Sequence, residues 1–232
     1  MCSVIGGLLL NPTEADLKLV RNVLVESSIR GLHATGLSYI KNNKIITVIE
    51  PSSSEVFLEK HPSILTDAVN EDGNLYMVAH CRYSTSDLQY NQPMYNNNFS
   101  IVHNGVITQE LPEKWKGLYG YDCKTKNDSE LILHTLSADK SPLEEFPDSS
   151  IAAVELHLDK KIRFYRNGKR PIYFTQTEKG YIITSTADIA ARAGLSDSFQ
   201  LEMNQYMTVA SDMTVTIKRA AIDRKDLQNA IH

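Results

Sequence analysis

The sequence predicts an α+β fold in which antiparallel β-sheets pack against layers of helices. Two observations lead to this class. Many short apolar or alternating segments follow one another along the chain, and most of them are joined by connections of hairpin length. Only a few segments have helical periodicity, so the chain lacks the regular alternation of strand and helix that a doubly wound parallel sheet requires.

The clearest helix is predicted from Thr13 to Ser28. Apolar residues recur there at helical spacing, Thr13 can cap the first turn, and Gly31 follows the end. Before this helix, residues 3–10 form an apolar run that predicts a buried strand. Its two adjacent glycines indicate that another segment approaches the backbone closely.

The remaining elements follow from the same patterns. Strands are predicted over residues 35–40, 44–50, 74–83, 99–105, 151–158, 161–167, 171–176, 181–186, 206–210 and 214–219. The first two of these strands form a hairpin through Asn42 and Asn43. Further helices are predicted over residues 128–137, 186–193 and 223–231, with one or two weak helices in the polar stretch 51–73.

The helix over residues 128–137 is expected to be capped by Asp128 or Ser129. No Pro-, Gly- or Ser-rich linker, internal repeat or low-complexity tract divides the chain. We therefore expect residues 1–232 to form one domain.

Composition and charge exclude several classes of function. The 232 residues are 42% hydrophobic and 22% charged, which is typical of a globular protein. A formal charge of -4, a pI near 6.0 and scattered Lys and Arg argue against nucleic-acid binding. No apolar run approaches the roughly 20 residues of a membrane span, and the N-terminus lacks the regions of a signal peptide. We expect no membrane association and a cytoplasmic location.

The thiols and imidazoles predict neither a disulfide framework nor a metal site. The cysteines, Cys2, Cys81 and Cys123, are odd in number and form no CxxC pair. The seven histidines lack the HExxH and His-x-His spacings of metal sites, and no phosphate-binding GxGxxG or GxxxxGK[ST] motif occurs. The sequence therefore predicts no metal and no cofactor.

Cys2 has a chemistry that depends on its position. If Met1 is removed, Cys2 becomes the N-terminal residue and carries both a thiol and a free α-amino group. An α-amino group has an ordinary pKa of about 7.7 to 8.0, so about a tenth of it is neutral at pH 7 and can accept the thiol proton. From position alone, a chance residue, a small buried hydrophobe or a lipidation site is the better interpretation.

Several short motifs occur in an order that changes this balance. They are "RGLHATG" at 30–36, "HCRYST" at 80–85, "NQP" at 91–93, "IVHNG" at 101–105, "NDSE" at 127–130, "RNGKRPIYF" at 166–174 and "STADIAARAG" at 185–194. Together, on a chain that begins Met-Cys, they resemble the class II glutamine amidotransferases, whose glutaminase domain is an N-terminal nucleophile hydrolase. The resemblance spans essentially the whole chain and implies a four-layer αββα sandwich of two antiparallel sheets between helix layers.

The resemblance implies the catalytic residues. Cys2 would attack the side-chain amide of glutamine, and the Asn104 side chain with the Gly105 N–H would stabilise the tetrahedral oxyanion. Glycine at 105 lets the backbone come near the reacting carbon. Without the resemblance, Asn-Gly is better explained as a tight turn between strands.

The resemblance also implies the substrate-binding residues. Arg82 would bind the α-carboxylate of glutamine with its planar guanidinium, and Asp128 would bind the α-ammonium group. Thr85 would line the glutamine pocket, and Arg30 and Gly31 would lie beside the terminal cysteine. In isolation, Arg82 is better explained by a surface ion pair and Asp128 by a helix cap.

Two positions depart from the family pattern, and three histidines attract attention. His33 stands where the family usually has an acidic residue, and Asp87 stands where a glycine normally belongs to the loop that closes over bound glutamine. Both departures bear on substrate affinity. We expect His80, His103 and His134 to be structural, since they fall in predicted strands and a predicted helix.

Three functions remain open. The first is a glutaminase that supplies ammonia to a separate synthase partner, because the resemblance occupies the whole chain. The second is a stand-alone hydrolase of another γ-glutamyl amide. The third is a non-catalytic regulatory or interaction module. Arg82 and Asp128 together suit free L-glutamine and favour the first.

Overall fold

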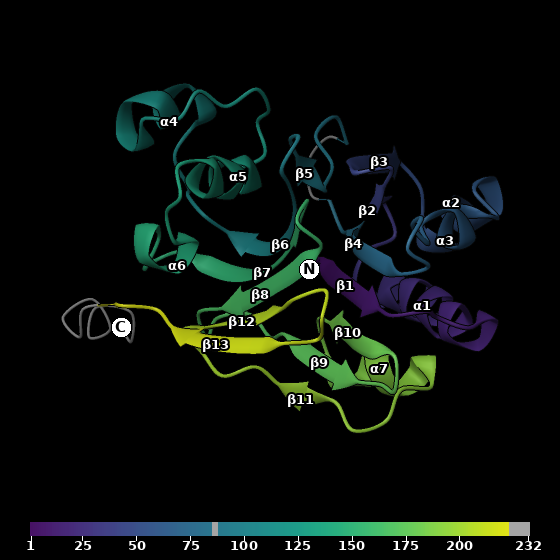
Figure 1. The fold of residues 1–232 in the computed structure, drawn as a ribbon. Coiled ribbons are helices and arrows are strands. Elements are labelled where there is room, and N and C mark those ends of the chain that lie inside the picture. The colour runs from purple at the N-terminus through teal and green to yellow at the C-terminus, as the bar shows by residue number, and fades with distance from the viewer. Residues whose placement is uncertain (85–87, 223–232) are drawn as a thin grey trace.

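The computed structural model describes residues 1–84 and 88–222 (Figure 1). Its helices are α1 (Glu14–Ser27), α2 (Ser54–Lys60), α3 (Ile64–Asp67), α4 (Pro112–Tyr119), α5 (Ser129–Ser137), α6 (Pro142–Glu145) and α7 (Ala187–Ala193), with one 3-10 turn, η1 (Ser28–Arg30). Its strands are β1 (Ser3–Leu9), β2 (Ala34–Lys41), β3 (Lys44–Glu50), β4 (Leu75–Arg82), β5 (Met94–Tyr95), β6 (Phe99–Val106), β7 (Ser150–His157), β8 (Lys161–Arg166), β9 (Tyr173–Gln176), β10 (Gly180–Thr184), β11 (Phe199–Gln200), β12 (Gln205–Val209) and β13 (Val215–Arg219).

The strands form two antiparallel sheets. Sheet A has the order β11-β9-β10-β1-β4-β2-β3, and sheet B has the order β13-β12-β8-β7-β6-β5. All the strand pairs within both sheets are antiparallel. The predicted α+β class is therefore confirmed.

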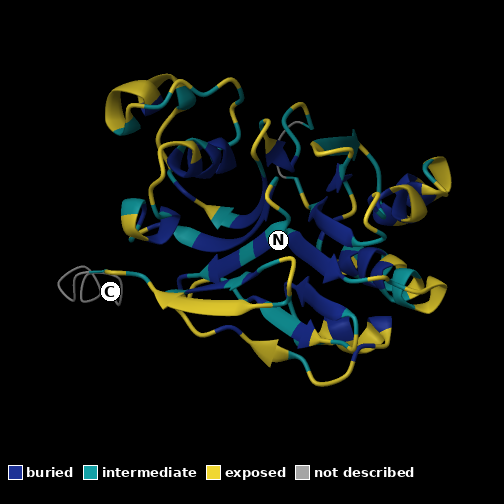
Figure 2. Cartoon of the chain, viewed as in Figure 1, coloured by how far each residue is buried: buried dark blue, intermediate teal, exposed yellow. Residues whose placement is uncertain are grey.

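Three apolar clusters define four layers. One cluster lies between sheet A and helices α1, α2, α3 and α7, and another lies between sheet B and helices α4, α5 and α6. The third fills the space between the two sheets and includes Val4, Val78, Val102 and Val154. The expected αββα order is confirmed, with the two groups of helices on opposite sides of the molecule in Figure 1. Figure 2 shows that the central strands are buried while the outer helix faces and β13 are exposed.

The clearest sequence predictions hold in detail. Thr13 forms a capping box with Asp16 at the start of α1, and the helix passes through η1 to Gly31. Asn42 and Asn43 both adopt left-handed conformations, with φ of 50° and 52°, as a tight two-residue hairpin between β2 and β3 requires. A Cβ on Gly6 would lie 2.8 Å from Val154 Cγ1, so sheet B does approach β1 closely.

Other predictions need correction. Asp128 occupies the N-cap position of α5, but neither its side chain nor that of Ser129 caps the helix, because the Asp128 carboxylate binds backbone N–H groups of another segment. Helices α4 and α6 were not predicted, since both are short and begin at a proline. The helix predicted over residues 223–231 lies outside the described residues.

No helix in the described ranges has both the length and the apolar character needed to cross a bilayer.

A buried ion pair fixes the register of β7 and β8 on the helix-facing side of sheet B. Glu155, which is fully buried, accepts hydrogen bonds from Arg163 Nε at 2.7 Å and Nη2 at 3.2 Å, and its Oε2 lies 2.7 Å from His157 Nε2. Burial raises the pKa of the Glu155 carboxyl, but the charges and hydrogen bonds of Arg163 and His157 outweigh burial and lower the pKa to about 2.

We expect Arg163→Met to lower the free energy of unfolding by about 3 to 5 kcal/mol at pH 7, because it leaves a buried carboxylate without its main partner. The folded-state pKa of Glu155 is depressed, so the stabilisation from the pair is present above the ordinary pKa and is lost as the pH falls toward 2. The difference between the variant and the wild type should therefore shrink as the pH falls below about 5.

Urea unfolding at several pH values measures this difference. Arg192→Met is the matched control, because Arg192 pairs with Asp188 on the surface and should contribute less than about 0.5 kcal/mol. A pH-independent loss in Arg163→Met would contradict the account.

Candidate functional site

The start of β1 places Cys2 opposite the end of β4. Ser3 pairs with Cys81 and Val4 pairs with His80, so the next position along the same register sets Cys2 beside Arg82. The Val4 N–H also donates to Ser185 Oγ at 2.8 Å, which fixes the first residues of β1 against the segment that begins α7. The N-terminus lies in the middle of the molecule rather than at its edge (Figure 1).

Strand alternation places the Cys2 and Asn104 side chains on facing sides of the two sheets. Val4 lies in the cluster between the sheets, and Cys2 is two residues before it, one position outside β1. Val102 also lies in that cluster, and Asn104 is two residues after it on β6. Both side chains are therefore directed into the space between sheet A and sheet B.

A hydrogen bond across the sandwich shows that these positions lie at the same end. Ser38 Oγ on β2 and Ser100 Oγ on β6 are 2.8 Å apart. Ala34 lies four residues before Ser38 on β2, and Asn104 lies four residues after Ser100 on β6. Both steps lead toward the same end of the sandwich. Ala34 pairs with Arg82, the neighbour of Cys2. The row Ala34–Arg82–Cys2 of sheet A is therefore level with Asn104 of sheet B.

Arg30 contacts Cys2, and Gly31 lies against Cys81 at the end of β4. Arg30 Nε donates to the Cys2 carbonyl at 3.0 Å, and Arg30 Nη2 lies 3.7 Å from Met1 Sδ. Cys2 Sγ lies 3.7 Å from the Tyr83 carbonyl oxygen. A Cβ on Gly31 would lie 2.3 Å from the Cys81 carbonyl oxygen, so only glycine fits where η1 passes the end of β4.

The other two thiols are poor candidates for a nucleophile. Cys81 is fully buried, and burial raises the pKa of its thiol to about 12. Burial and the charges of Glu130 and Asp122 raise the pKa of the Cys123 thiol to about 12 as well. Both remain protonated at neutral pH, whereas thiol chemistry needs the thiolate.

Asn104 and Gly105 lie within a strand rather than a turn. They pair with Ala152 and Ile151 on β7, so the interpretation of Asn-Gly as a tight turn is wrong. Gly105 has a φ of +152°, and a Cβ there would lie 1.8 Å from the Ser150 carbonyl oxygen. Glycine is required at this position because β7 passes directly over it.

The Asn104 amide is one of the buried polar groups at this end of the sandwich that lack a partner in the described part of the chain, with Ser3 Oγ and His80 Nε2. The residue is 4% exposed, and its Nδ2 has no hydrogen-bond partner among the described residues. Buried side-chain amides nearly always have partners, since an unpaired one costs about 1 to 3 kcal/mol. A donor kept buried and unpaired is suited to bind an oxygen that arrives with a ligand.

The proposed substrate-binding residues are held by specific contacts. Arg82 Nη1 donates to the Tyr90 carbonyl at 2.9 Å and to Asn91 Oδ1 at 2.6 Å. These contacts hold the half-buried Arg82 guanidinium against the segment around residues 90 and 91. Asp128 Oδ2 accepts from the N–H groups of Ile107 at 2.6 Å and Thr108 at 3.3 Å, just beyond the end of β6.

Thr85 and Asp87 lie outside the described residues. His33, the other departure from the family pattern, lies beside the segment that leads to them. Its Nδ1 accepts from the Ser84 N–H at 2.9 Å, and its ring contacts that of Tyr83 with 4.9 Å between centroids. His33 therefore supports the chain immediately before residue 85.

The histidines near this end are structural, as expected. His103 Nε2 donates to the Ser150 carbonyl at 3.0 Å, and Nδ1 then accepts from the Ser129 hydroxyl at 2.9 Å. Burial lowers the pKa of His103. Burial, together with the nearby charges of His103 and Arg82, lowers the pKa of His80 to about 3. Both rings are neutral at pH 7 and buried, so neither supplies a cation to activate a thiolate.

Sequence reasoning missed the structural role of Gln92. β5 pairs with β6 only at Met94 and Tyr95. Beyond β5, the Gln92 side chain forms the hydrogen bonds to β6. Gln92 Oε1 accepts from the His103 N–H at 2.6 Å, and Nε2 donates to the His103 carbonyl and to Ser129 Oγ, both at 3.0 Å. An amide side chain with one acceptor and two donor hydrogens can satisfy all three groups, so Gln92 continues the edge of sheet B beside Asn104.

Two cavities among the described residues are lined by residues other than Cys2 and Asn104. One, of about 350 Å³, includes Tyr90 and Asn91, the partners of Arg82. The other, of about 980 Å³, lies around His157 and Arg163, at the end of sheet B far from Asn104. Neither includes Cys2 or Asn104.

Part of the sequence matches a known family model. Residues 80–192 match the family model of the glutamine amidotransferase domain, a range that contains Arg82, Asn104 and Asp128 but not Cys2. No curated protein matches the sequence.

Solved structures share the fold at low sequence identity. The glutamine phosphoribosylpyrophosphate amidotransferase from B. subtilis, complexed with ADP and GMP, is 15% identical with a TM-score of 0.74, over 96% of this chain and 50% of that chain. A structure described as the allosteric regulatory enzyme of purine biosynthesis gives the same values. A glutamine aminotransferase class-II domain protein from Silicibacter pomeroyi is 11% identical with a TM-score of 0.57, over 95% and 100% of the two chains. The chain spans about half the length of the first two structures.

We expect Gln92→Leu to lower the free energy of unfolding by about 2 to 4 kcal/mol, because it leaves the buried N–H and carbonyl of His103 without partners. Urea unfolding measures this loss. Gln176→Leu is the matched control, since Gln176 is exposed on β9 and should change stability by less than about 0.5 kcal/mol. Equal effects of the two substitutions would show that Gln92 does not hold this edge.

Proposed function

We propose that the chain is a class II glutamine amidotransferase that hydrolyses the side-chain amide of glutamine with Cys2 as the nucleophile. The family match over residues 80–192 and the shared fold support this proposal. The observation that carries this proposal is the buried, unpaired Nδ2 of Asn104, level with Cys2 on the facing sheet. A nucleophile alone does not define a reaction. A nucleophile facing a preorganised N–H donor suits a reaction that develops an oxyanion.

The reaction needs a proton acceptor, and the α-amino group of Cys2 is the group that fits. With Met1 in place, the Cys2 nitrogen is an amide and cannot accept a proton. Removal of Met1 exposes the amine and frees the Arg30 Nη2 contact with Met1 Sδ. Burial lowers the pKa of His80 and of His103, so both imidazoles are weak bases, and the amine is the base best placed beside the thiol.

The chemistry then follows in two steps. The Cys2 thiol gives its proton to the amine, and Sγ adds to the amide carbon to form a tetrahedral oxyanion that the Asn104 Nδ2–H and the Gly105 N–H stabilise. The carbon–nitrogen bond breaks, the protonated amine supplies the proton to the leaving nitrogen, and ammonia leaves a thioester on Cys2. Water then hydrolyses the thioester to glutamate and restores the thiol.

We infer that substrate recognition rests on two fixed charges of opposite sign, which bind the two charged groups on the Cα of glutamine. The planar guanidinium of Arg82 suits the α-carboxylate of glutamine and is oriented by Tyr90 and Asn91. The Asp128 carboxylate suits the α-ammonium group and is oriented by the N–H groups at the end of β6. In this proposal Thr85 lines the same pocket.

The ammonia formed in this reaction needs an acceptor, and we propose that a synthase partner receives it. A second candidate is a stand-alone hydrolase of another γ-glutamyl amide. It is favoured by the two departures from the family pattern, because His33 contacts Ser84 and Tyr83 just before the segment that contains Asp87. A non-catalytic module is disfavoured by the unpaired Asn104 amide, which costs stability if nothing binds it.

The purified protein should release ammonia from glutamine, and intact mass should show that Met1 is absent from the active form. Cys2→Ala should lower turnover by more than about 1000-fold while leaving the circular dichroism spectrum unchanged. A glutamine-specific assay run with and without candidate synthases separates the alternatives. Efficient hydrolysis of another γ-glutamyl amide but not of glutamine would reject glutamine as the substrate.

Asn104→Ala should lower kcat by about 100- to 1000-fold with little change in KM, because the Nδ2–H donor acts on the oxyanion rather than on bound substrate. The variant should be as stable as the wild type or more stable, since it removes an unpaired buried donor. Asn97→Ala, an exposed asparagine just before β6, is the matched control. A change confined to KM would place Asn104 in substrate binding instead.

A further inference from the structure

A second group of chemically active side chains lies on the helix-facing side of sheet B. Cys123 lies on the segment between α4 and α5, and Glu130 and His134 are one turn apart on α5. One ligand atom from each of the three residues lies within 4.8 Å of the others. The mechanism above uses none of these residues.

We propose that Cys123, Glu130 and His134 bind a transition-metal ion of the zinc class. A thiolate, an imidazole and a carboxylate are the donors that zinc takes in proteins, and a bound zinc ion displaces the proton of the Cys123 thiol into solvent. Magnesium and calcium prefer oxygen donors alone. Three protein ligands leave the fourth tetrahedral position for water. This inference does not rest on the proposed function.

The geometry of Glu130 and His134 fits two ligands of one ion better than it fits an ion pair. His134 Nε2 lies 3.5 Å from Glu130 Oε1, which is too long for a charge-assisted hydrogen bond of about 2.7 to 2.9 Å. Two ligands on a tetrahedral zinc, each about 2.05 Å from the metal, lie about 3.3 Å apart. The other separations are at most 4.8 Å, so binding needs about 1 Å of closure.

The hydrogen bonding leaves room for a cation. His134 Nε2 is hidden from solvent and has no hydrogen-bond partner among the described residues. Glu130 Oε1 accepts one hydrogen bond, from the Lys124 N–H at 2.8 Å, and so retains a second lone pair. An ion between these atoms would satisfy the imidazole nitrogen and the carboxylate oxygen at once.

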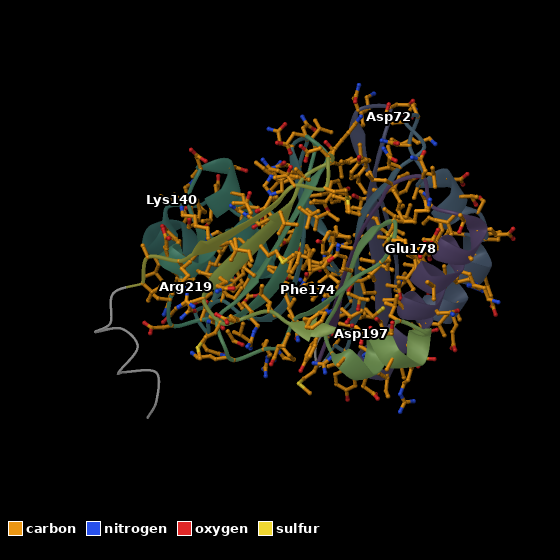
Figure 3. All side chains as sticks on the ribbon, turned by 60° about the horizontal axis from the view of Figure 1, so that its bottom comes forward. Asp72, Lys140, Phe174, Glu178, Asp197 and Arg219 are labelled. Atoms are coloured by element: carbon orange, nitrogen blue, oxygen red, sulfur yellow. The ribbon has the colours of Figure 1, made fainter. Side chains whose placement is uncertain are left out.

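The surroundings hold the ligands in place. Glu130 is 6% exposed, and its Oε2 accepts from both the N–H and the hydroxyl of Thr125 at 2.7 Å. The Tyr121 ring stacks on the His134 ring, with 5.5 Å between centroids and 11° between planes. Lys140 Nζ lies 6.0 Å from the centroid of the Tyr121 ring, and Lys140 is labelled in Figure 3.

The ion would connect the segment before α5 to the helix itself. Cys123 is six residues before Ser129, the first residue of α5. Glu130 and Thr125 also line the cavity of about 350 Å³, so there is space for water beside the cluster. A metal here would hold the loop that leads to Asp128.

Cobalt(II) added to chelator-treated protein tests the site directly, because cobalt replaces zinc and its absorption spectrum reports both geometry and sulfur ligation. We expect one cobalt per chain, with tetrahedral visible bands and a thiolate-to-cobalt charge-transfer band. Zinc should displace the cobalt and raise Tm. Cys123→Ser should abolish the charge-transfer band, and His134→Gln should weaken cobalt binding at least about tenfold.

Two variants control for thiols and imidazoles elsewhere. Cys2→Ser removes the N-terminal thiol, and His61→Gln removes an imidazole that is 32% exposed, against 30% for His134. Both should bind cobalt like the wild type. A charge-transfer band that survives in Cys123→Ser, or is lost in Cys2→Ser, would overturn the proposal.

X-ray absorption on wild-type cobalt protein keeps the test decisive if a ligand variant fails to fold. One sulfur and two or three nitrogen or oxygen neighbours support the site. A shell of nitrogen and oxygen alone, or no stoichiometric binding, rejects it. The proposed glutaminase activity is measured separately, so failure of one proposal leaves the other standing.

Discussion

The alignment of two sheet ends is the constraint on which the candidate site depends. Cys2 belongs to sheet A and Asn104 belongs to sheet B, so no single hairpin or helix fixes their relation. It is fixed by the Ser38–Ser100 hydrogen bond between the sheets and by Gln92, whose side chain continues the edge of β6 where β5 stops. The apolar cluster between the sheets stabilises their packing, and these polar contacts fix the position of one sheet relative to the other.

The electrostatics of this end of the sandwich favour a neutral, preorganised site. His103 is fully hydrogen bonded through Ser129 and Ser150, and burial keeps its ring uncharged. Asn104, by contrast, keeps a buried donor without a partner. In a site of low polarity such a donor is worth more to a developing oxyanion than it is in water, because it needs no reorganisation when charge appears.

Much of the fold follows from local patterns in the sequence. The capping box of α1, the Asn42–Asn43 hairpin and the close approach of sheet B to Gly6 were predicted because each depends on a few neighbouring residues. The strand predicted over residues 99–105 is confirmed as β6, and the alternative of a tight Asn-Gly turn is wrong because register with β7, a long-range constraint, places both residues in a strand. The predicted cap by Asp128 was wrong for the same reason, since its carboxylate serves the end of β6.

The candidate site residues were predicted through motifs rather than through spacing. The motifs named Arg30, Gly31, Arg82 and Asn104, but they gave no sign that Gln92 would complete a sheet edge. Nor did spacing reveal the Cys123–Glu130–His134 cluster, because the loop before α5 brings Cys123 back to the helix face.

The central claim is that Cys2 reacts as the N-terminal residue of the mature chain. The most direct test is to treat active protein with the glutamine analogue diazo-oxo-norleucine and to locate the adduct by peptide mass spectrometry. The account predicts one adduct per chain, on a Cys2 that has lost Met1, together with loss of ammonia release. Label on Cys81 or Cys123, or full activity in chains that retain Met1, would contradict it.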